Sequence, residues 1–152
     1  MWGMAHGFEV RDLETAQHEA AHVVVGARLG LRLEIASLGP WPGCRKTSPD
    51  AHALGYASFF EKRGDGTAQA IMLAAGVAWD RALGYDPWHS TFDWQECRKI
   101  VRGVQSVEAC VTAAAAMIAR LGTFHARVTR ALLERDITGA DLAALCRGEE
   151  LE

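Results

Sequence analysis

The chain has 152 residues, of which 49% are apolar and 23% are charged, and its formal net charge is −3. This length and balance are typical of one globular domain with its own core, so the sequence predicts a single domain over residues 1–152. The small net charge gives no electrostatic reason to expect nucleic acid as a partner.

The cysteines and the apolar runs indicate the compartment. Cys44, Cys97, Cys110 and Cys146 are far apart and form no C-x-x-C pair, which argues against a thiolate zinc site. Residues 1–12 lack the apolar stretch of a secretion signal, and the longest apolar run, at 109–119, is too short to span a bilayer. We therefore expect a cytoplasmic protein with reduced thiols and no membrane segment.

The first elements expected along the chain are a helix and two short strands. Asp12 is a suitable N-cap for a helix from Leu13 to about Leu29, which Gly30 would end. Strands are expected at 31–38 and 53–60, and the loop between them is rich in proline and glycine. The two strands are close enough in sequence to pair.

The rest of the chain is predicted to be helical. After a turn at 64–66, helices are expected at 67–83, at about 93–120 and at 124–135, with Gly122 breaking the chain between the last two. Residues 138–141 resemble a capping box and start a last short helix. The predicted fold is α+β and mostly helical, with a small sheet and a C-terminal helical bundle.

The first helix has apolar residues on one side and a pair of histidines on the other. At about 100° per residue, one stripe collects the apolar residues at 13, 16, 20, 23, 24 and 27. His18 and His22 lie opposite that stripe, together with Ala21 and Val25. Because apolar residues stand on both sides, we expect other elements to cover both faces of this helix.

The segment from His18 to His22 is an H-E-x-x-H motif. Two histidines at i and i+4 point the same way from a helix, so both can bind one ion. Zinc accepts imidazole nitrogen, and a catalytic zinc site adds a third protein ligand and keeps one position open for water. Glu19 flanks the ion and could take a proton from the activated water and pass it to a leaving amine. The motif favours a zinc hydrolase over a surface helix with two incidental histidines.

The residues alone leave the third ligand open. Asp86 precedes a proline and is typical of a turn. Asp80 stands late in a helix and could hydrogen-bond a ligating histidine instead of the ion. His89 is a good ligand type, since three-histidine zinc sites are common. Asp93 could simply cap the helix that follows it, although a carboxylate has two oxygens and can cap and ligate at once.

Several stretches of the chain resemble the FtsH-type zinc peptidases, the protease part of the FtsH-type membrane ATPases. T-A-Q-H-E-A-A-H-V-V-V-G at 15–26 is similar to the family's H-E-A-G-H helix, and A-L-G-Y at 53–56 is similar to its A-L-G-Y strand. Residues 74–93 resemble the G-G-R-A-A-E-E helix and the loop ending in S-N-D, and residues 132–142 resemble the closing helices. The order and spacing agree over most of the chain, which implies a zincin-like fold.

The resemblance also implies roles for particular residues. It makes Asp93, in the place of the S-N-D aspartate, the third zinc ligand beside His18 and His22. It makes the strand around Leu54, Gly55 and Tyr56 the edge that pairs with a substrate backbone. Ring assembly of the family implies a homo-oligomer.

The chain departs from the family pattern at several positions. Ala21 replaces the motif glycine, and Phe92 replaces the asparagine before the ligand. Val77 and Arg81 stand where the family has arginine and glutamate, while Asp80 keeps one acidic position. The sequence contains no G-x-x-x-x-G-K-[ST] loop, so ATP-driven unfolding is not carried over.

The sequence therefore predicts a zinc-dependent, ATP-independent metalloendopeptidase that hydrolyses extended or unfolded polypeptide, with Glu19 as general base. Stable folded substrates would need a separate unfoldase. One alternative is a zinc-binding adaptor or regulatory module without activity, against which the intact Glu19 argues. The other is a zinc hydrolase of a non-peptide substrate, because the motif fixes the water chemistry more firmly than the substrate.

Overall fold

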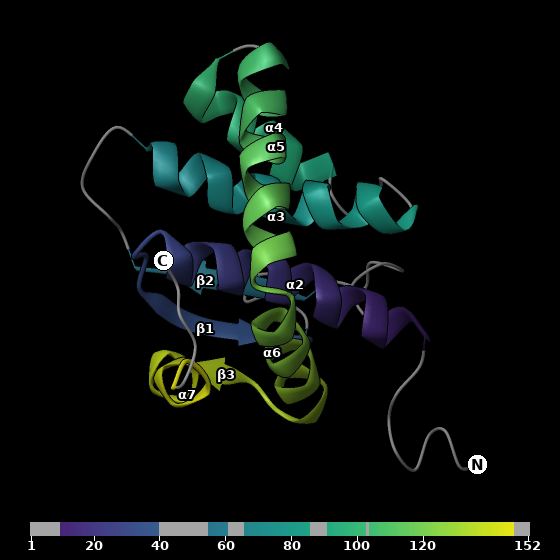
Figure 1. Ribbon diagram of the computed structural model, residues 1–152, viewed down its shortest axis with the longest axis vertical. Coiled ribbons are helices and arrows are strands. Elements are labelled where there is room, and N and C mark those ends of the chain that lie inside the picture. Colours follow the sequence, from purple (N-terminus) through teal and green to yellow (C-terminus); the bar gives the residue numbers. More distant parts are fainter. Residues whose placement is uncertain (1–9, 40–54, 61–65, 86–90, 103, 148–152) are drawn as a thin grey trace.

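The computed structural model describes residues 10–39, 55–60, 66–85, 91–102 and 104–147. Its helices and strands form a mostly helical molecule with one three-stranded antiparallel sheet (Figure 1), which confirms the predicted α+β class. In chain order the elements are α2 (Val10–Arg28), β1 (Leu33–Ser37), β2 (Tyr56–Phe59), α3 (Thr67–Leu83), α4 (Thr91–Val101), α5 (Val104–Arg120), α6 (Gly122–Glu134), β3 (Ile137–Thr138) and α7 (Gly139–Leu145).

Helix α2 begins earlier than the sequence predicts. Because Val10 is already helical, Asp12 lies inside the helix, and the prediction that Asp12 is its N-cap is wrong. The C-terminal end agrees with the prediction. Gly30 has a φ of 78°, a left-handed conformation that glycine adopts without strain, and the amide of Leu31 donates to the carbonyl of Gly26 at 2.9 Å.

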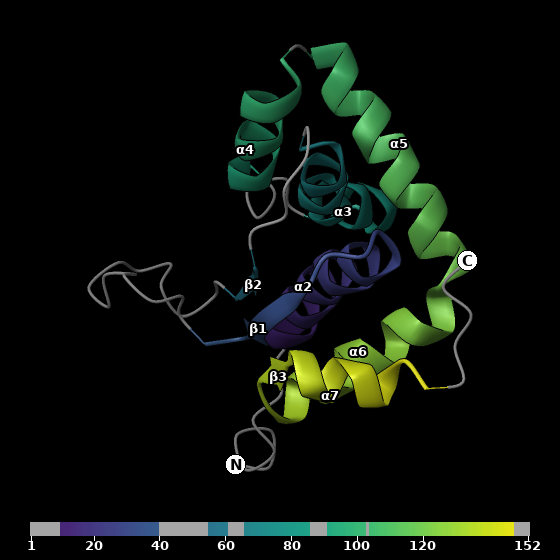
Figure 2. The same cartoon turned by 90° about the vertical axis from the view of Figure 1, so that its left-hand side faces the viewer.

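Helix α2 lies in the middle of the molecule, with α3, α4 and α5 on one side and α6, α7 and β3 on the other (Figure 2). Ala21 and Val25 belong to the apolar cluster formed with α3, α4 and α5. The opposite face belongs to the cluster formed with β1 and α6, through Ala16, Ala20, Val23 and Val24. The prediction that both faces of this helix are covered is confirmed, although Leu13 at the end of the stripe is 41% exposed.

The single helix predicted at 93–120 is two helices, α4 and α5. The break falls after Arg102, whose φ of 50° is a left-handed conformation that ends a right-handed helix, and a glycine follows it in the sequence. A second bend of 88° separates α5 from α6 at Leu121. Among the described residues, no single helix has the length and hydropathy of a membrane span; only this bent pair, counted together, does so.

The small sheet packs against α2. Its strand order is β2-β1-β3, with Ser37 of β1 opposite Tyr56 of β2, so the predicted pairing of the first two strands is confirmed. A Cβ on Gly26 would lie 2.6 Å from the ring of Phe59, which explains why α2 has a glycine there. The predicted strand from 53 begins, within the described residues, at Tyr56.

The predicted capping box starts helix α7. The Thr138 amide donates to Asp141 Oδ2 at 2.9 Å, and the Asp141 amide donates to Thr138 Oγ1 at 3.4 Å. These reciprocal bonds satisfy two backbone groups that the first turn of a helix leaves unpaired. The turn from β3 into α7 is therefore fixed by local hydrogen bonds, which is why the sequence alone could predict it.

Candidate metal centre

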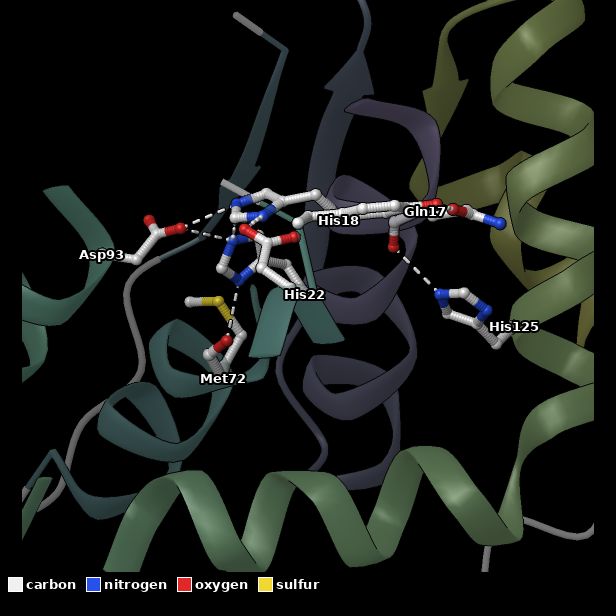
Figure 3. Close-up of polar contacts among 8 residues, drawn as sticks. Gln17, His18, His22, Met72, Asp93 and His125 are labelled. Atoms are coloured by element: carbon white, nitrogen blue, oxygen red, sulfur yellow. Dashed lines mark hydrogen bonds and ion pairs between the residues drawn. The ribbon is translucent and has the colours of Figure 1, made fainter. Parts of the chain in front are cut away.

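Helices α2 and α4 bring three side chains to one point (Figure 3). His18 and His22 lie one turn apart on α2, and Asp93 lies in the first turn of α4, 75 residues after His18. Asp93 Oδ2 is 2.8 Å from His18 Nε2 and 3.0 Å from His22 Nε2, and the two Nε2 atoms are 3.1 Å apart. Among the described residues, these three form the cluster that could hold a metal ion.

Helix α3 sets the orientation and the tautomer of both histidines. The Nδ1–H of His18 donates to Asp80 Oδ2 at 2.9 Å, and the Nδ1–H of His22 donates to the carbonyl oxygen of Met72 at 2.8 Å. With Nδ1 protonated in each ring, the lone pair of each neutral imidazole is on Nε2. Both lone pairs therefore face Asp93, in the arrangement that metal-binding histidines usually have.

Three electron-pair acceptors within 2.8–3.1 Å of one another would repel one another unless a proton or a metal ion lies between them. Burial disfavours protonation of His18, yet hydrogen bonds to Asp80 and Asp93 outweigh burial and hold its pKa well above the usual value. The pKa of His22 is likewise raised, since the charge of Asp93 overcomes the effect of burial. The site thus attracts positive charge, either as protons or as a metal ion.

The donor set fits zinc. Two imidazole nitrogens and one carboxylate oxygen are ligands that catalytic zinc sites use, and tetrahedral zinc would separate its ligand atoms by about 3.3 Å. The observed separations of 2.8–3.1 Å are only a few tenths of an ångström shorter. All three side chains are largely buried, since Asp93 is 14% exposed, His18 8% and His22 5%.

Gly76 lets α3 approach the two histidines. A Cβ at this position would lie 2.4 Å from His18 Cε1 and 2.8 Å from His22 Nε2, which is closer than real contacts allow. Gly76 lies inside the helix predicted at 67–83, and the sequence alone assigns it no role. Its position could have indicated a role, because glycine in a helix interior costs about 1 kcal/mol of stability relative to alanine.

Glu19 is buried beside the three side chains. It follows His18 on α2, is 6% exposed, and has a pKa raised by burial against the opposing charges of His18 and His22. The residue just before strand β2 lies against the stem of this side chain, since a Cβ on Gly55 would lie 2.9 Å from Glu19 Cγ. The predicted strand residues thus start next to the predicted base; Tyr56 is half-buried, and Leu54 lies outside the described residues.

The other candidate residues are placed in different ways. Asp80 is 2% exposed and contacts the Nδ1 atom of His18, on the side of the ring away from the ligand cluster. This is the second of the two roles that the sequence analysis left open for it. His89 and Asp86 lie outside the described residues. Phe92 is 67% exposed.

His125, on the other side of α2, contributes to packing (Figure 3). Its Nε2–H donates to the backbone carbonyl of Gln17 at 2.9 Å, and its ring lies against Trp79 with the centroids 4.0 Å apart. Burial lowers its pKa, which keeps the ring neutral.

Comparison with known proteins finds no relative of this chain. No family model matches the sequence, and neither the curated proteins nor the solved structures searched give a match. The interpretation of the site therefore rests on the residues and their geometry.

Proposed function

We propose that this chain is a zinc-dependent metallopeptidase with His18, His22 and Asp93 as the metal ligands. The observation that carries the proposal is the convergence of their three acceptor atoms, at 2.8–3.1 Å, while both Nδ1 protons are directed to other partners. A site designed only for stability would not be expected to aim three lone pairs at one point. When bound, zinc would supply Lewis acidity and lower the pKa of water toward neutrality.

Glu19 is the proposed general base and then general acid. Its carboxylate takes a proton from the water whose oxygen attacks the peptide carbonyl carbon. It then donates that proton to the amide nitrogen as the C–N bond breaks. Its raised pKa, caused by burial, suits both steps, because a base with a pKa nearer to neutrality also returns the proton more easily.

Strand β2 is the proposed binding edge for substrate. Among the described residues, β2 pairs with β1 on one side and has no strand partner on the other. Gly55, directly before the strand, lies against Glu19. An extended polypeptide that adds to this edge would place its backbone beside the base, and backbone pairing needs no particular side chain. The proposed substrate is therefore an extended or unfolded polypeptide.

Exchanging Glu19 for glutamine tests the proposal. Glu19→Gln should keep about one zinc per chain and lose hydrolysis of an unfolded casein-like substrate, since an amide cannot take the proton. Zinc content by elemental analysis and release of peptides are the two measurements. His18→Ala is the control, because it should lose both properties.

The outcomes separate the candidate functions. Full turnover by Glu19→Gln would show that Glu19 is not the base. A wild-type protein that binds zinc but cuts no flexible peptide would favour the adaptor or a non-peptide substrate. If the wild-type protein does not bind zinc at neutral pH, the proposed metal site is wrong. Protons on His18 and His22 would then supply the positive charge that holds the three side chains together.

A further inference from the structure

Helix α4 supplies Asp93, and one residue of α5 contacts both α4 and α3 near the metal centre. Glu108 accepts a forked pair of hydrogen bonds from Arg81 of α3, at 2.7 Å from Nη1 and 3.1 Å from Nη2. Arg81 first, and Trp94 of α4 last and least, hold the pKa of the Glu108 carboxyl below its usual value through hydrogen bonding. Arg81 directly follows Asp80 in sequence, and Trp94 directly follows Asp93.

This arrangement places Glu108 behind both carboxylates of the site. Consecutive residues of a helix point about 100° apart. Asp80 and Asp93 face His18, so Arg81 and Trp94 are turned away from it. Arg81 reaches Glu108 of α5, and Trp94 packs against the apolar cluster that α3 and α5 share. The guanidinium of Arg98, 5.6 Å from the centre of the Trp94 ring, packs on the same side chain.

We propose that Glu108 is a positioning residue for the metal centre. By joining Arg81 and Trp94, it sets the separation between α3, which orients both histidines, and α4, which supplies the third ligand. The inference rests on the proposed zinc site. Asp93 must come within a few tenths of an ångström of its place for all three ligands to bind one ion, so a small shift of α4 would weaken binding.

The Arg81–Glu108 ion pair is exposed to solvent, so a role in positioning the metal centre can be distinguished from a contribution to overall stability. The side chains of Arg81 and Glu108 are 49% and 46% exposed, and exposed ion pairs add little to folding. A forked arginine–carboxylate pair nevertheless fixes direction as well as distance. The loss of Glu108 should therefore change the site more than the free energy of unfolding.

The experiment compares Glu108→Ala and Glu108→Gln with Glu96→Ala. Glu96 is a matched control because it is an acidic residue with a lysine partner, Lys99 at 2.9 Å, but both lie on α4 and join no second helix. The full chain is titrated with zinc against a competing chelator, and the visible spectrum of bound Co²⁺ reports the ligand geometry, which a merely stabilising residue would leave unchanged.

Glu108→Ala should weaken zinc binding about threefold to tenfold, less than the loss of a direct partner of a ligand, and alter the Co²⁺ spectrum. Glu108→Gln should be intermediate, because its amide oxygen still accepts hydrogen bonds. Glu96→Ala should match the wild type in both measurements. Unchanged affinity and spectrum in Glu108→Ala would overturn the inference alone, as would equal losses in Glu96→Ala. A wild-type chain that binds neither ion would overturn the zinc site and this inference with it.

Discussion

Gly76 lies where α3 passes closest to the two histidines, so its missing side chain is a requirement of the site. We expect Gly76→Ala to bind zinc far more weakly or not at all, because the added methyl would occupy space now held by the ring atoms of His18 and His22, 2.4–2.8 Å away. Zinc titration against a chelator measures this effect.

Gly122→Ala is the matched control for this exchange. Gly122 also lies in a helix, and a Cβ there would meet nothing within 4 Å. It should bind zinc like the wild type and be slightly more stable, since alanine is the better helix former. Zinc affinity retained by Gly76→Ala would mean that α3 can move away from the histidines.

The two aspartates that contact His18 should differ in their effect on zinc. Asp93→Ala removes a proposed ligand and should lower zinc affinity strongly. Asp80→Asn should lower it by about 10–100-fold or less, because the amide oxygen of asparagine can still accept the Nδ1–H of His18. Competition titrations of the two variants give the ranking, and the reverse order would show that the ligand assignment is wrong.

The sequence was sufficient to predict the site residues that lie close together along the chain. His18 and His22 are one helical turn apart, so their shared direction follows from the period of the helix. The choice among Asp80, His89 and Asp93 depends on how α3 and α4 pack on α2, and the residues alone left it open. The carbonyl of Met72 could not be found at all, because a backbone acceptor has no signature in sequence.

At the level of secondary structure, the capping box of α7 can be tested, because the change in free energy of unfolding on loss of such a cap is known. Thr138→Ala removes the oxygen that accepts the Asp141 amide, and the loss of such a cap costs about 0.5–2 kcal/mol of the free energy of unfolding. Urea unfolding should show this decrease. Thr112→Ala is the control, since Thr112 lies in the interior of α5 and its hydroxyl only bonds the preceding turn of its own helix.

The end of α2 and the start of α7 were predicted from local features, whereas Asp12 gave a wrong start for α2 and the break between α4 and α5 was missed. Gly30 and the Thr138 cap mark their boundaries in the sequence itself. The break between α4 and α5 has a weaker signal, since residues 93–120 contain no proline and only one glycine, at 103. Helix α5 leaves the direction of α4 to cover α3, so this bend belongs to the tertiary structure.

For the whole molecule, the edge position of β2 limits the proposed substrates. Adding a chain to this edge requires an extended segment, and opening a stable domain to obtain one costs on the order of 5–15 kcal/mol. We therefore expect cleavage of flexible peptides and unfolded chains, and none of a stable folded domain, whether or not ATP is present. Incubation with an unfolded casein-like protein and with a stable domain measures both rates.

The control in this assay is the same stable domain after it has been destabilised by a core substitution. It should be cut in proportion to the population of its open form. Efficient cleavage of the intact stable domain would contradict the edge-binding mode, and a stimulation by ATP would contradict the expectation drawn from the missing phosphate-binding loop.

Helix α2 belongs to both apolar clusters, and this has a consequence for cooperativity. The helix cannot leave one cluster without also uncovering the other, so its opening is coupled to unfolding of the whole molecule. A ligand held by His18 and His22 is attached to this shared helix. Its binding free energy, about 4 kcal/mol at a thousandfold excess over the dissociation constant, would therefore stabilise both halves of the protein together.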